Sequence, residues 1–88
     1  MNLKIDKQFS KDVKRLKNPD LHKRLAQLLR SIQTATSIEE LKGVKKLTGH
    51  TAFYRIRLGA YRIGAEIQGN TITLIRFLHR KEIYTYFP

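Results

Sequence analysis

The alternation of hydrophobic and polar residues is strongest between residues 53 and 67, where it predicts two β-strands that fold back on each other. Gly59 interrupts the run where the chain must reverse, and glycine tolerates the backbone angles of a tight hairpin. The apolar positions on one face are Tyr54, Ile56, Leu58, Tyr61, Ile63, Ala65 and Ile67. The opposite face carries Arg55, Arg57 and Arg62, so we expect a helical layer on the first face and an anionic partner or solvent on the second.

Hydrophobic residues at helical spacing precede this hairpin. Phe9, Val13 and Leu16 predict a first helix that ends at Lys17, after a short strand that contains Leu3 and Ile5. Asn18 is a suitable cap for a second helix, and Pro19 suits its first position. The apolar stripe of this second helix is Leu21, Leu25, Leu28, Leu29 and Ile32.

The remaining segments complete a two-layer arrangement. Ser37 and Glu40 have the spacing of a capping box and predict one helical turn, which Gly43 ends. Residues 44–52 are polar and basic and are expected to form a loop, and residues 68–70 a turn. A third strand is expected over residues 71–78, with Ile72, Leu74 and Leu78 on one face and Ile75 and Phe77 on the other. The order predicts a single α+β domain, residues 1–88, in which an N-terminal strand and helix hairpin pack on a mostly antiparallel sheet.

The charge of the chain favours a polyanionic partner. The 88 residues contain 18 Lys and Arg against 7 Asp and Glu, a net charge of +11. A field of this sign attracts nucleic acid and speeds encounter with it, although a merely solvated surface is the alternative. No apolar run approaches the ~20 residues of a membrane span, and the first residues lack the apolar block of a signal peptide, so we expect a cytoplasmic protein.

Several chemistries find no support in the sequence. There is no cysteine, and His22, His50 and His79 lie on three different predicted elements, so no metal site is expected. No glycine-rich phosphate loop precedes a helix, and no nucleotide or other cofactor is expected. The side chains left for chemistry are those of arginine, lysine, histidine and tyrosine.

The segment YRIRLGAYRI (residues 54–63), followed by HRKEIY (residues 79–84), resembles the signature of the RelE/ParE toxin superfamily of toxin–antitoxin systems. The helix hairpin and residues 41–43 and 46–49 resemble it too. The resemblance implies a helix pair on one sheet face and a concave basic groove on the other. RelE-type members cleave messenger RNA in the ribosomal A site without metal, leaving a 2′,3′-cyclic phosphate and a 5′-hydroxyl. ParE-type members poison DNA gyrase, and a cognate antitoxin neutralises either type.

Carried over to this sequence, the motifs imply a set of site residues. The catalytic candidates are Arg55, Arg57, Arg62, His79, Arg80 and Tyr84, and the RNA-binding candidates are Lys45, Lys46, Arg76 and Lys81. Arg62 and Arg80 suit a phosphate clamp, and His79 or Tyr84 could transfer protons. Alternatively, Tyr84 could stack on a base, Arg76 could snorkel past the core edge, and Phe87 is expected to close the core.

The leading hypothesis is a metal-independent, ribosome-dependent messenger-RNA endoribonuclease that inhibits translation, with an antitoxin and ribosome-bound messenger RNA as partners. The alternatives are a ParE-type gyrase inhibitor without nuclease activity and a basic nucleic-acid-binding module. Some superfamily members have a glutamate or lysine as the presumed base where this chain has arginine. Because arginine does not release its proton, the mechanism is expected to depend on His79 or water.

Overall fold

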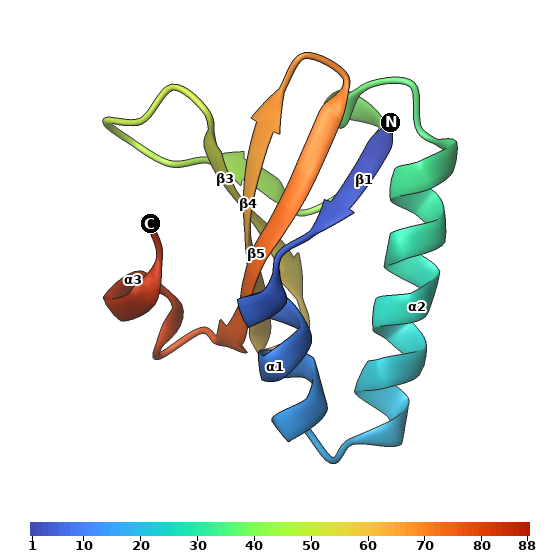
Figure 1. Ribbon diagram of the computed structural model, residues 1–88, viewed down its shortest axis with the longest axis vertical. Coiled ribbons are helices and arrows are strands. Elements are labelled where there is room, and N and C mark those ends of the chain that lie inside the picture. Colours follow the sequence, from blue (N-terminus) through green and yellow to red (C-terminus); the bar gives the residue numbers. More distant parts are fainter.

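The computed structural model describes residues 1–88, and its centre is a five-stranded sheet in the order β1-β5-β4-β3-β2 (Figure 1). β1 runs parallel to β5, and every other neighbouring pair is antiparallel. The strands are β1 (Asn2–Ile5), β2 (Val44–Lys46), β3 (Phe53–Leu58), β4 (Tyr61–Gln68) and β5 (Thr71–His79). The mostly antiparallel sheet confirms the predicted fold class.

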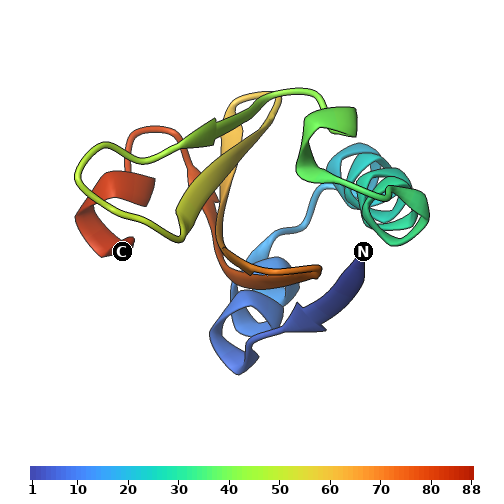
Figure 2. The ribbon, with the colours of Figure 1, turned by 90° about the horizontal axis from the view of Figure 1, so that it is seen from above.

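Helices lie on both sides of this sheet. They are α1 (Lys7–Arg15), α2 (Pro19–Thr34), the 3₁₀ turn η1 (Ile38–Glu40) and the short α3 (Ile83–Tyr86). Seen from above, α2 lies on one side of the sheet and α3 on the other (Figure 2). None of these helices combines the length and the hydrophobicity needed to cross a lipid bilayer.

The break between α1 and α2 forms largely as its residues predict. The Asn18 side chain accepts the N–H of Leu21 at 3.2 Å, and Pro19 begins α2. α1 ends at Arg15, two residues before the predicted Lys17, because Leu16 already has an extended backbone. The carbonyl of Leu16 lies 2.6 Å from His22 Nε2, which connects the break to the first turn of α2.

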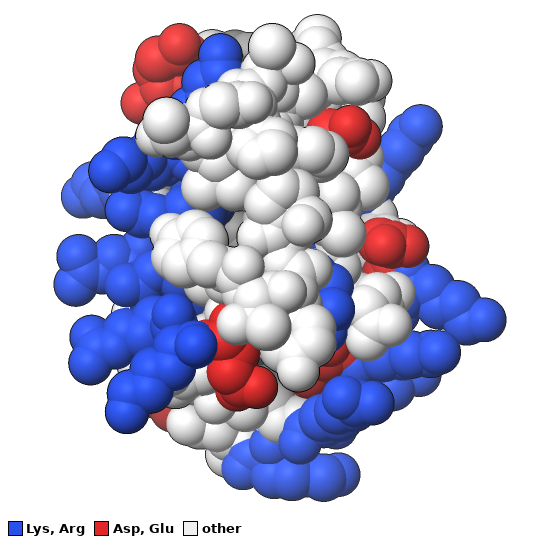
Figure 3. Space-filling view, turned by 90° about the vertical axis from the view of Figure 1, so that its left-hand side faces the viewer, with Lys and Arg blue, Asp and Glu red and all other residues white.

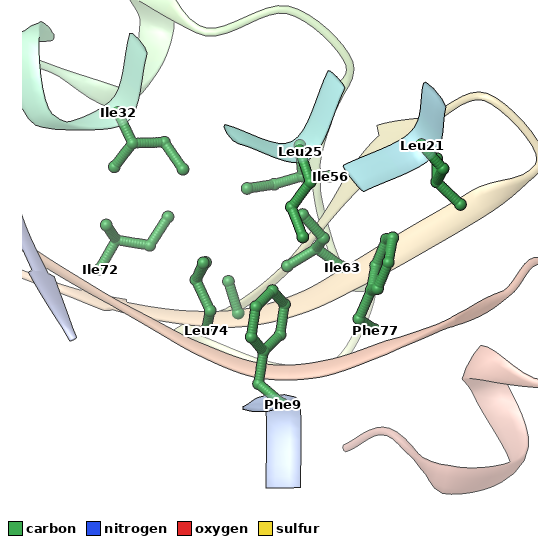
Figure 4. Close-up of a cluster of buried hydrophobic side chains, with 10 residues drawn as sticks. Phe9, Leu21, Leu25, Ile32, Ile56, Ile63, Ile72, Leu74 and Phe77 are labelled. Carbon is green, nitrogen blue, oxygen red and sulfur yellow. The ribbon is translucent and has the colours of Figure 1, made fainter. Parts of the chain in front are cut away.

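The hydrophobic core lies between α2, α1 and the sheet (Figure 4). Its fully buried side chains include Ile32, Ile56, Ile63, Ile72 and Leu74. Leu21 and Leu25 are buried as predicted, whereas Leu28 is only half-buried and packs against the margin of the cluster. The predicted layering is therefore confirmed, with Leu28 at its edge.

Two predictions about the strands were wrong. Residues 44–46 form β2, which pairs with β3 through backbone hydrogen bonds although its own side chains show no buried face. In β5, Gly64 of β4 faces Arg76 whereas Ala65 faces Leu74, so Ile75 is an extra residue. This bulge reverses the alternation, and Phe77 rather than Leu78 joins Ile72 and Leu74 in the core.

Candidate functional site

Three arginines share the sheet face that points away from the core, which we call the arginine face. Arg55 and Arg57 alternate with the buried Ile56 on β3, and Arg62 precedes the buried Ile63 on β4. Arg57 pairs directly with Arg62 in the β3–β4 register. Like charges directly opposite each other destabilise a sheet, so this arrangement favours a function over a purely structural role.

Neutral backbone carbonyls, not carboxylates, accept hydrogen bonds from two of these arginines. Arg62 Nη1 donates to the carbonyls of Gly59 and Tyr61, both at 2.9 Å, and Arg55 Nη1 donates to the carbonyl of Gly43 at 3.1 Å. Burial lowers the pKa of the Arg62 guanidinium, and repulsion from Arg55 and Arg57 lowers it further. The site is therefore a region of positive potential, and a bound anion would reduce the repulsion among its arginines.

The C-terminal segment adds Arg80 and Tyr84 to this face. Arg80 follows β5 directly, and its N–H donates to the carbonyl of Ala60 at 2.8 Å. The positive charge of Arg80 also lowers the pKa of Arg62, while Tyr84 raises it, so both groups lie within electrostatic reach of that guanidinium. Strand pairing and the turn after β5 thus bring together five of the six predicted catalytic residues.

Phe87 attaches α3 to the sheet. Its ring is buried, lies over Gly64 of β4, and meets the ring of Phe53 edge-on at 5.5 Å. Phe87 therefore closes an apolar contact, but on the sheet face opposite the main core, where it fixes the helix that carries Tyr84.

A cavity of about 360 Å³ opens between β2, the loop after it, β3 and α3. Its lining residues are Lys45, Lys46, Leu47, Thr48, His50, Arg55, Tyr84, Phe87 and Pro88. The cavity brings the predicted RNA-binding residues Lys45 and Lys46 beside two predicted catalytic residues. His50 was not predicted as a site residue, because no motif in the sequence marks it and only its residue type suggested a role, as a metal ligand. It directly follows residues 46–49, which belong to the superfamily resemblance.

His79 and Arg76 lie elsewhere. The His79 ring packs edge-on against Tyr61 at 5.5 Å, and its Nδ1 accepts the N–H of Lys81 at 3.1 Å. His79 lines a separate hollow with Asp12 of α1. Arg76 Nε donates to Asp12 Oδ2 at 2.8 Å, and its guanidinium lies 5.4 Å from the ring centre of Tyr86. Lys81 is exposed in the turn between β5 and α3.

Apart from one pair, the basic side chains of the protein have no carboxylate partner. The pair Arg76–Asp12 is the single ion pair in the structure. Figure 3 shows Lys and Arg gathered in two groups on either side of a band of other residues. No group of three or more His, Asp and Glu side chains is placed to hold a metal ion. The chemistry available on the arginine face is that of guanidinium, ammonium, imidazole and phenol groups.

Comparison with known proteins identifies the class to which this fold and site belong. Residues 3–84 match the family described as the ParE toxin of type II toxin–antitoxin systems, parDE. The chain belongs to this family and is a toxin of a type II toxin–antitoxin system.

Within this class the chain is RelE-like. It is 43% identical over 89 residues to Toxin RelE3 of Methanocaldococcus jannaschii, and the alignment covers 100% of both chains. It also resembles a chain of the RelB–RelE antitoxin–toxin complex from Methanococcus jannaschii, with a TM-score of 0.81, 42% identity and coverage of 97% and 99%. The archaeal RelE–RelB complex from Pyrococcus horikoshii OT3 shares the fold, with a TM-score of 0.72, 24% identity and coverage of 93% and 97%. The superfamily expected from the motifs is confirmed.

Proposed function

We propose that this toxin is a RelE-type endoribonuclease that cuts messenger RNA on the ribosome and so stops translation in the cytoplasm. One observation carries the proposal. Arg55, Arg57, Arg62, Arg80 and Tyr84 converge on one sheet face, and no carboxylate neutralises the four arginines. A scissile phosphate is an anion of suitable size and charge for this arrangement.

The proposed chemistry is intramolecular transesterification of RNA. The ribose 2′-oxygen attacks the adjacent phosphorus, negative charge builds on the phosphoryl oxygens, and the 5′-oxygen departs with a proton. Guanidinium groups can grip two phosphoryl oxygens at once and stabilise that charge, which we assign to Arg62 and Arg80. Nη1 of Arg62 already binds two carbonyls, which fixes the group and leaves its other nitrogens for the phosphate.

We assign Tyr84 the role of proton donor to the departing oxygen. Tyr84 lines the cavity together with Arg55, and Phe87 holds α3, the helix that carries Tyr84, against the sheet. Lys45 and Lys46 line the same cavity and can contact the RNA backbone on either side of the scissile bond. We leave Arg76 out of this set because Asp12 already neutralises it.

A cognate antitoxin is the second proposed partner. Two of the similar solved structures are complexes of a RelE toxin with a RelB antitoxin. We expect the antitoxin of this protein to place an acidic segment on the arginine face. Its affinity should then weaken as salt rises from about 50 to about 500 mM, because salt screens exposed charges.

The alternative is inhibition of DNA gyrase, and the name of the matching family favours it. A gyrase inhibitor needs a binding surface but no phosphate clamp. The two functions therefore differ in what the loss of one arginine should do to RNA cleavage.

The test is messenger-RNA cleavage on programmed ribosomes, with gyrase supercoiling measured in parallel. Arg62→Ala and Arg80→Ala should each slow cleavage about 10²–10³-fold, and Arg80→Lys should restore it only in part. Lys23→Ala, on the exposed face of α2, is the matched control and should cleave as the wild type does. Wild-type protein that inhibits gyrase and leaves RNA intact would establish the alternative.

A further inference from the structure

The arginine face has no group suited to remove the proton of the 2′-hydroxyl. Guanidinium groups stay protonated in proteins, and the phenol of Tyr84 is assigned to the departing oxygen. Proton removal near neutral pH is most efficient with a group whose pKa lies in that range, and imidazole is the side chain whose ordinary pKa does. The position of each histidine is therefore informative.

Only one of the three histidines lines the cavity that contains Arg55 and Tyr84. His22 is on α2 and contacts the carbonyl of Leu16, and His79 packs on Tyr61 in a separate hollow next to α1. His50 instead lines the 360 Å³ cavity with Arg55 and Tyr84. The fold thus places one imidazole in the cavity that also contains the proposed proton donor.

Aromatic contacts connect the exposed His50 ring to the segment at α3. It meets the ring of Phe53 edge-on at 5.4 Å, and Phe53 in turn meets Phe87 at 5.5 Å. The backbone N–H of His50 donates to the carbonyl of Leu47 at 3.3 Å, which closes a turn in the loop after β2. The chain Phe87–Phe53–His50 therefore ties the loop histidine to the helix that carries Tyr84.

We propose that His50 accepts the 2′-hydroxyl proton in the RNA cleavage proposed above, and the inference rests on that function. The 2′-O–H proton moves to the unprotonated nitrogen of His50, the 2′-oxygen bonds to phosphorus, and the P–O5′ bond breaks. The departing 5′-oxygen takes the phenolic proton of Tyr84. His50 then returns its proton through water to the tyrosinate. The charged or titratable groups that share the cavity with His50 are Lys45 and Lys46 of β2, Arg55 of β3 and Tyr84 of α3.

The test compares single-turnover cleavage rates on programmed ribosomes over one pH series for wild type and matched histidine variants. His50→Gln should slow cleavage about 10²–10⁴-fold and remove the inflection between about pH 5 and 8. His22→Gln is the control, since His22 lies outside the cavity, and should keep both the rate and the inflection. Circular dichroism and thermal unfolding show that each variant is folded.

A second measurement separates proton transfer from a merely structural role. His50→Ala should regain cleavage when imidazole is added, in proportion to its concentration, whereas imidazole should not change the wild-type rate. A slowed His50 variant that keeps the wild-type pH profile and gains nothing from imidazole would overturn the inference. An inflection lost in His79→Gln instead would overturn it as well. Wild-type protein that cleaves no RNA would overturn the proposed function and this inference together.

Discussion

The ring of Phe87 lies so close to Gly64 that a Cβ atom added to Gly64 would be 2.5 Å from Phe87 Cγ. Phe87 directly follows α3, and Gly64 lies in the middle of β4. Gly64 has an ordinary extended backbone, so the absence of a side chain, and not a special conformation, is what this contact requires. The contact holds the segment that contributes Tyr84 to the site.

Gly64→Ala should therefore displace Phe87 and destabilise the protein by about 1–3 kcal/mol, the usual effect of overpacking a close contact. Chemical denaturation measures the loss. In a Phe87→Ala background the same substitution should have little effect, because the clashing ring is gone. Equal losses in the two backgrounds would show that the two residues are not coupled.

The ion pair between Asp12 and Arg76 should be a strong local determinant of stability. Asp12 is buried and accepts from Arg76 at 2.8 and 3.1 Å and from the N–H of Phe77 at 2.9 Å. Asp12→Ala leaves both donors without a partner and should lower the free energy of unfolding by about 3 kcal/mol. Asp20→Ala, at the exposed start of α2, is the comparison. A loss no greater than that of Asp20→Ala in urea denaturation would contradict the prediction.

Asp12 should also make stability depend on pH. Burial raises the pKa of Asp12, but hydrogen bonds from Arg76, from the Phe77 N–H and from Gln8 outweigh this, so the pKa lies below its ordinary value. A carboxyl whose pKa is depressed by folding stabilises the protein above its unfolded pKa, about 3.9, and loses this contribution as pH falls through the folded pKa. The difference in stability between wild type and Asp12→Asn should be constant above about pH 5 and shrink below pH 4. Thermal unfolding across this range measures it.

We expect Arg57 to lower the stability of the fold while it contributes to RNA cleavage. It faces Arg62 directly across β3 and β4, so Arg57→Gln removes a like-charge pair and should raise the stability by about 0.2–1 kcal/mol. The same change should weaken messenger-RNA cleavage, because a cation leaves the proposed phosphate site. Arg30→Gln, on the exposed face of α2, should change neither quantity. Reduced stability in Arg57→Gln would show that the two arginines do not repel each other.

The elements that could be predicted from the sequence are those with one buried, apolar face. The stripe of α2 and the alternation at Ile56 and Ile63 are such cases, since burial of their apolar side chains selects the pattern. β2 could not be predicted in this way, because Lys45 and Lys46 are exposed and only backbone hydrogen bonds to β3 define the strand. The bulge at Ile75 could not be predicted either. With or without it, the sequence of β5 places apolar residues on both faces of the strand.

The candidate site was predictable to a similar degree. Arg55, Arg57 and Arg62 follow from the alternation of one hairpin, and the motif after β5 supplied Arg80 and Tyr84. The partner of Arg76 could not be predicted, because Asp12 is 64 residues away in the chain. The different surroundings of His50 and His79 depend on a loop fold and on the reversed alternation after Ile75, neither of which has a local sequence signal.

The bond from Phe77 to Asp12 also protects the sheet from association with other chains. β1 ends at Ile5, opposite Leu74, so β5 continues beyond it without a neighbouring strand on that side. An open edge of this kind can pair with a strand of another molecule and start aggregation. α1 packs along this stretch, and its Asp12 carboxylate takes the N–H that an incoming strand would use. One side chain thus allows β5 to extend beyond the end of β1 and still resist edge-to-edge pairing.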